Sequence, residues 1–79
     1  MEEVVLLPPS ERRAITEKID ENADGNTYFG SAVSGTATSA AGWRIQRKSV
    51  SGTETTFAFA DGDIKFDNVW DDRTTLTYS

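Results

Sequence analysis

Hydrophobic and polar residues alternate with a period of two over much of the second half of the chain, which is typical of β-strands. The clearest example is the segment WRIQR, in which Trp43 and Ile45 fall on one face and Arg44 and Gln46 fall on the other. One face of this predicted strand is therefore apolar and the other is polar.

A second alternating segment ends at a strong turn signal. Residues 55–60, TTFAFA, place both of their phenylalanines on one side of a predicted strand. Asp61 and Gly62 follow it and favour a hairpin turn that needs positive φ angles. Ile64 and Phe66 continue the alternation, so we expect the second strand of the hairpin there.

Other segments predict loops, a helical turn and a last strand. Residues 34–42, SGTATSAAG, are small and have little to bury, which predicts a surface loop, and Ser51-Gly52 predicts a chain reversal. Residues 67–73, DNVWDDR, break the alternation and indicate a single helical turn or a bulged connection. Residues 74–78 alternate again and predict a closing strand.

The pattern of residues 10–20 fits both a helix and a strand. Ile15 and Ile19 are four residues apart, as on a helix, yet they also share one face of a strand. Residues 21–26 are rich in turn formers and lead into strand-favouring residues 27–29. We therefore favour a strand for the second half of this segment, followed by a hairpin.

These segments amount to five or six short strands at spacings of about ten residues, which predicts an all-β fold. A small antiparallel barrel and a sandwich both fit the pattern. All aromatic residues lie between Tyr28 and Tyr78, so we expect the core in that part of the chain. Three of them are predicted as fold or interface anchors: Trp43, Trp70 and Tyr78. Stacking on a sugar is the alternative role for the two tryptophans.

The first nine residues, MEEVVLLPP, predict an extended arm in front of a single β domain of residues 10–79. Proline lacks a backbone donor and holds the preceding residue in an extended conformation. The apolar arm is suited to docking on a neighbouring subunit, and an added edge strand on its own sheet is the alternative. The predicted docking residues are Val4, Val5, Leu6, Leu7, Pro8 and Pro9.

Composition restricts the chemistry. A chain of 79 residues forms one small domain, and such a domain buries only about 60% of its unfolded surface, so we expect a partner to stabilise it. The chain has no Cys and no His, which excludes disulfides, thiol nucleophiles and catalytic triads. The acidic residues between Asp61 and Asp72 fit a calcium loop poorly. We expect no metal, no cofactor and no enzymatic activity.

The formal net charge of −5 argues against binding to nucleic acid or to an anionic membrane surface. No run of 18 apolar residues is present, and the acidic start Met1-Glu2-Glu3 differs from a signal peptide. We therefore expect synthesis in the cytoplasm, with assembly into a larger particle as a later step.

Three motifs carry a resemblance to a known group of proteins. They are YFG at 28–30, GTATSAAGWRI at 35–45, and ADG at 60–62 followed by FDNVWDDRTTLTY at 66–78, and the match extends over roughly residues 14–79. In these motifs the sequence resembles short β-rich proteins encoded among the structural genes of tailed bacteriophages.

The resemblance implies a virion component without chemistry of its own, made in the host cytoplasm. We expect an accessory protein that decorates or cements the head by binding assembled major capsid protein, and that forms a homo-oligomer. The alternatives are a neck, tail or tail-fibre component, including a small glycan-binding β module, and a cytosolic regulator that binds a host protein.

Overall fold

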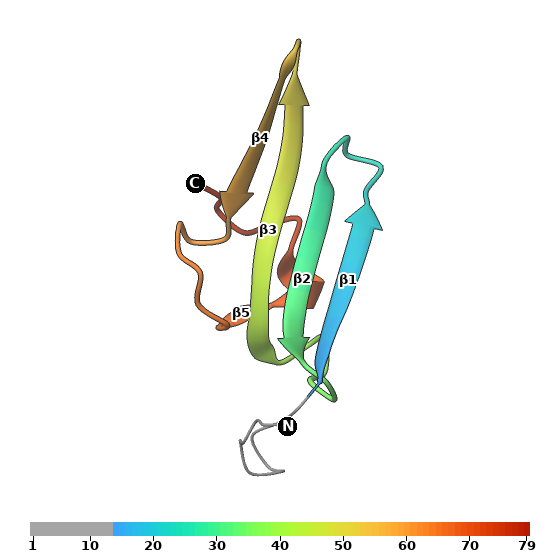
Figure 1. Cartoon of the computed structure of the whole chain (residues 1–79), viewed down its shortest axis with the longest axis vertical. Helices are drawn as coiled ribbons and strands as arrows, with labels where there is room; N and C mark the ends of the chain where they lie inside the picture. Colours follow the sequence, from blue (N-terminus) through green and yellow to red (C-terminus); the bar gives the residue numbers. More distant parts are fainter. Residues whose placement is uncertain (1–13) are drawn as a thin grey trace, which may run out of the picture.

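The computed structural model describes residues 14–79, which form an antiparallel β-sheet with a C-terminal segment packed behind it (Figure 1). The predicted arm, Val4 to Pro9, lies outside the described residues. The elements are β1 (Ile15–Glu21), β2 (Thr27–Val33), β3 (Ala41–Ser51), β4 (Glu54–Phe59), β5 (Asn68–Val69) and a 3-10 helix (Trp70–Asp72).

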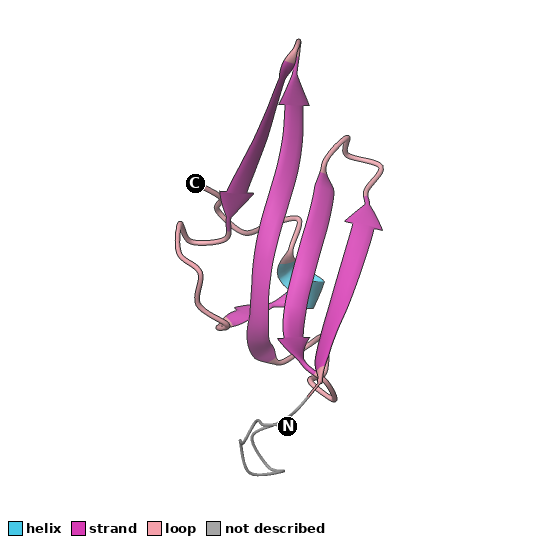
Figure 2. Cartoon of the chain, viewed as in Figure 1, coloured by secondary structure: helices cyan, strands magenta, loops and turns pink. Residues whose placement is uncertain are grey.

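The first four strands follow one another across the sheet in the order β1-β2-β3-β4, each antiparallel to the next. The short strand β5 pairs with the start of β3 through Ala41–Val69 and Trp43–Asn68. The all-β prediction is confirmed. The sheet is open, so of the two predicted architectures the closed barrel is not formed (Figure 2).

The hairpin predictions for the first half of the chain are confirmed. The ambiguous segment becomes β1 in its second half, and Asn22 and Asn26 close the turn to β2 with a backbone hydrogen bond of 2.9 Å. The backbone N–H groups of Asp24 and Asn26 donate to the side-chain oxygens of Asn22 and Asp24, and these Asx hydrogen bonds hold the turn. The 3-10 helix confirms the helical turn predicted within 67–73.

The turn after β4 is confirmed, whereas the strand predicted at Ile64 and Phe66 is wrong. Asp61 and Gly62 have φ angles of 59° and 72°, as the turn signal requires. Beyond β4, Ala60 forms a bridge with Tyr78 instead. The end of the chain thus occupies the position that the predicted strand would have taken.

The predicted closing strand over 74–78 is also wrong, apart from the single bridge at Tyr78. Thr75 donates both its backbone N–H (2.9 Å) and its hydroxyl (2.9 Å) to the carbonyl of Asp72. A threonine that bonds to its own local backbone favours a turn over a strand. Residues 73–75 therefore continue the helical turn before the chain returns to the sheet.

The hydrophobic core lies between one face of the sheet and the C-terminal segment. Tyr28, Trp43 and Ile45 are the largest fully buried side chains, and Trp70 packs on them at 5% exposure. The other core members are Ala32 and Ala60, with Leu76 and Tyr78 partly buried against them. We call this side of the sheet the covered face.

Candidate functional site

The opposite side of the sheet, which we call the open face, is viewed directly in Figure 1. Paired residues in neighbouring strands point to the same side, so the strand register assigns each side chain to a face. Ile19, Phe29, Gln46 and Phe59 are successive partners across the four strands and form one row of the open face. The buried aromatic Tyr28 belongs to the other face.

The open face is rich in exposed apolar side chains. Ile19 is 67% exposed and Phe57 is 55% exposed. The ring centroids of Phe29 and Phe57 lie 6.3 Å apart, which forms an aromatic pair across β3. Ile15 and Val50 also lie exposed on this face. Single exposed apolar residues are ordinary, whereas a group of them on one sheet face marks an interaction surface.

Two rows across the open face each carry an acidic residue on β1 and a basic residue on β3. Glu17 on β1 pairs with Ser31 on β2, which pairs in turn with Arg44 on β3. Four residues further along each strand, Glu21 on β1 pairs with Thr27 on β2, which pairs with Lys48 on β3. The β1 side of the face is therefore acidic, and the β3 side is basic.

An open hollow of about 230 Å³ lies on this face between β1, β2 and β3. Ile19 and Phe29 contribute to its wall, with Glu17, Arg44 and Gln46 around them. The Arg44 side chain is held by a cation–π contact, in which its guanidinium carbon lies 5.1 Å from the centre of the Phe66 ring. The hollow combines apolar walls with both signs of charge.

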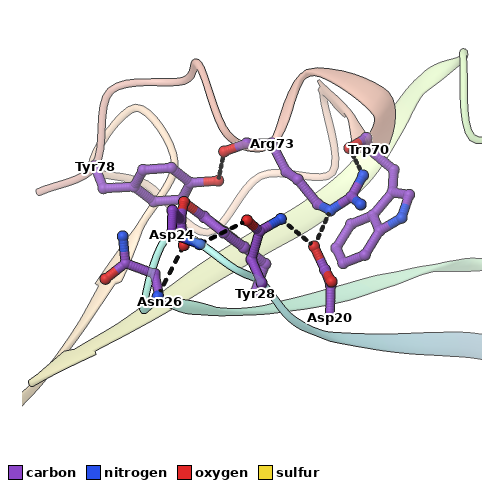
Figure 3. A network of polar contacts seen from close by, with 8 residues as sticks. Asp20, Asp24, Asn26, Tyr28, Trp70, Arg73 and Tyr78 are labelled. Atoms are coloured by element: carbon purple, nitrogen blue, oxygen red, sulfur yellow. Dashed lines mark hydrogen bonds and ion pairs between the residues drawn. The ribbon is translucent and has the colours of Figure 1, made fainter.

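The covered face is fastened by a polar network that joins β1 to the C-terminal segment (Figure 3). Arg73 Nε donates to Asp20 Oδ2 at 2.8 Å, and this is the ion pair that the described residues form. The Arg73 guanidinium also lies 4.6 Å from the centre of the Trp70 ring. Asn22 Nδ2 donates to the same oxygen of Asp20 at 2.8 Å, and this bond, together with Arg73, lowers the pKa of Asp20.

Two tyrosines extend the network. The Tyr28 hydroxyl donates to Asp24 Oδ2 at 2.7 Å, which lowers the pKa of Asp24, while burial raises the pKa of Tyr28. The Tyr78 hydroxyl donates to the carbonyl of Arg73 at 2.7 Å, and burial raises the pKa of Tyr78 to about 12. These contacts give structural roles to the polar groups of Tyr28, Asp24 and Tyr78. The Nε of Arg47, on the same face, is buried without a hydrogen-bond partner among residues 14–79.

The predicted anchor residues lie in or beside the core. Trp43 is 1% exposed, and its ring centroid lies 5.7 Å from that of Trp70. Its indole N–H donates to the carbonyl of Ala37 at 2.9 Å, which ties down the loop that precedes β3. Tyr78 packs beside them, with the Arg47 guanidinium 4.8 Å from the centre of its ring. Neither indole therefore offers an open ring face for stacking on a sugar.

In a chain without His or Cys, acidic side chains are the only candidate metal ligands. Within residues 14–79 they form no group of three or more that could hold a metal ion. Over the same residues, the structure contains no helix of the length and apolarity needed to cross a membrane.

The open face was not identified from the sequence. The signal was present in Tyr28-Phe29, where neighbouring aromatic residues must point to opposite sides of a strand. A strand with a large apolar residue on each side needs cover on both faces.

Comparisons with models of protein families, with curated proteins and with solved structures found no match to this chain.

Proposed function

We propose that this protein is a non-catalytic structural component of a tailed-phage particle that attaches to assembled virion proteins, in the first place as a head decoration or cement protein. The observation that carries the proposal is the open face, an apolar sheet surface that no described part of the chain covers. A small domain stabilises itself by burying such a surface against another protein. The virion setting comes from the motif resemblance.

The aromatic residues near β4 are the part of the open face that we assign to the virion partner. Phe57, on β4, is 55% exposed, and Phe66, which precedes β5 and lies against Arg44 of β3, is 47% exposed. Aromatic side chains bury the largest area per residue in an interface. The predicted arm, Val4 to Leu7, would add a second point of attachment.

Quantitative mass spectrometry of purified particles tests this function. Copies close to the number of major capsid proteins are expected for head decoration. A few copies per particle would shift the proposal to the neck, tail or fibre. Complete absence from particles would refute it in favour of a free cytosolic binder.

A variant pair tests the surface. Phe57→Asp places a charge on the open face and should reduce occupancy on particles at least tenfold. Thr56→Asp is the matched control, because Thr56 is exposed on the neighbouring position of β4 and points to the other side of the sheet. Equal occupancy of both variants would contradict a contact through Phe57.

A further inference from the structure

We infer that the β1–β3 part of the open face binds a second copy of this chain, with the two open faces packed against each other around a two-fold axis that runs along β2. The inference rests on the proposed role of the open face as a protein interface and names the partner for the β1–β3 part of it. The observation behind it is the order of charges across the three strands.

A two-fold axis parallel to the strands and placed over β2 leaves the position of each row along the strand direction unchanged. It reverses the order of the strands across the sheet. It therefore sets β1 of one copy over β3 of the other. Glu17 then faces Arg44 of the second copy, because both belong to the row that passes through Ser31. Glu21 faces Lys48 in the same way, through the row of Thr27.

Each of these pairs occurs twice in a two-fold interface, since residue i contacts residue j and the reverse. The same surface is thus complementary to itself in four places. A two-fold axis that runs across the strands would instead set β1 over β1 and bring glutamates together. Only the axis along the strands matches opposite charges in both rows.

The apolar centre of the face fits this arrangement. Phe29 lies on β2, at the axis, in the row midway between the two charged rows. Packed sheets lie about 10 Å apart with their strands nearly aligned, which is the space that two layers of side chains fill. The hollow beside Phe29 and Ile19 gives room for side chains of the opposite copy.

The dimer leaves β4 outside the overlap, because only β1, β2 and β3 are set against each other. Phe57, on β4, would therefore remain available to a virion partner on either side of the dimer, whereas Phe66 lies against Arg44 at the border of the overlap. The two interfaces adjoin at the Phe29–Phe57 ring pair, whose centroids lie 6.3 Å apart. The charge reversals on β1 and β3 test the dimer without changing Phe57.

Sedimentation velocity of the full chain over a range of concentrations tests the dimer. We expect twice the monomer mass for the wild type. Glu17→Arg alone and Arg44→Glu alone each introduce two like-charge pairs and should raise the dimer dissociation constant about tenfold or more. The double variant, Glu17→Arg with Arg44→Glu, should restore it to within about threefold of the wild type.

The matched controls are Glu54→Arg and Lys65→Glu, which make the same charge changes at exposed positions outside the overlap. They should leave the dissociation constant unchanged. A wild type that sediments as a monomer, or a double variant that stays dissociated, would overturn the dimer.

Particle occupancy separates the dimer from the proposed function. A monomeric protein whose occupancy still falls with Phe57→Asp overturns the dimer and leaves the function standing. Charge reversals that lower occupancy without changing self-association also overturn it, because the β1–β3 face then contacts a virion protein. A dimer restored by the double reversal supports the inference even if the protein is absent from particles.

Discussion

Arg73 Nε lies 2.8 Å from Asp20 Oδ2 and joins residues that are 53 positions apart in the chain. The same side chain lies over the Trp70 ring and donates to the Trp70 carbonyl at 3.1 Å. Arg73 thus fixes the C-terminal segment on the first strand of the sheet. The covered face depends on this fastening, because its core is completed by Trp70.

Arg73→Ala should lower the free energy of unfolding by about 1–2 kcal/mol, since it removes the cation–π contact with Trp70 and the hydrogen bonds to the Trp70 carbonyl and to Asp20. Asp20→Asn should have a smaller effect, because the ion pair is partly solvated and screened. Urea denaturation followed by circular dichroism measures both variants, with Lys65→Ala as the exposed control. A loss for Asp20→Asn as large as that for Arg73→Ala would show that the ion pair dominates.

Gly30 is the position where β2 lies closest to the C-terminal segment. A Cβ atom at Gly30 would lie 2.5 Å from two ring carbons of Trp70. Gly30→Ala should therefore displace the indole and destabilise the fold by about 1–3 kcal/mol, as overpacking of a core does.

The change is visible as a red shift or loss of the tryptophan fluorescence, to which Trp43 and Trp70 both contribute, together with a lower melting temperature. Ser31→Ala is the control on the adjacent residue, which points to the open face. If Gly30→Ala matched this control in both measurements, the close packing of Trp70 on β2 would be wrong.

The predictable parts of the fold were those governed by local pattern. The β1–β2 hairpin follows from the turn formers between Glu21 and Thr27, and the strand at Trp43 follows from strict alternation. The bridge between Ala60 and Tyr78 is a contact between distant segments, and no local preference encodes it. Alternation near Phe66 therefore predicted a strand that tertiary contacts replaced.

The candidate site was predictable only in part. Alternation correctly set Phe57 and Phe59 on one side of β4. Whether that side is buried depends on which face the C-terminal segment covers, and this is decided by the packing of Trp70 on Gly30. Periodicity within a strand carries no information about that choice.

Trp43→Phe should destabilise the protein by about 2 kcal/mol. The change removes part of a buried side chain and leaves the Ala37 carbonyl without the indole donor at 2.9 Å. Trp70→Phe removes a similar volume, and its indole makes no hydrogen bond to another residue of 14–79, so it serves as the control. Hydrogen exchange of the loop before β3 should increase in Trp43→Phe and stay low in Trp70→Phe. Equal exchange in both variants would argue against an anchoring role of the Trp43 indole.

Stability should fall as the pH rises from about 10 towards 12. Burial raises the pKa of Tyr78 to about 12 and also raises the pKa of Tyr28, so the folded state retains protons that the unfolded chain releases near pH 10. Below pH 10 both states hold these protons, and the contribution to stability is complete. Ionisation of Tyr78 would also remove its hydrogen bond to the Arg73 carbonyl.

Urea denaturation at pH 8, 10 and 11.5 measures this dependence, and Tyr78→Phe provides the comparison. The variant loses the hydrogen bond at every pH, so it should be less stable at pH 8 yet show a shallower decline above pH 10. The decline that remains would be due to Tyr28 and to other alkaline groups. Parallel declines in the wild type and in Tyr78→Phe would show that Tyr78 ionises as readily in the folded protein as in the unfolded chain.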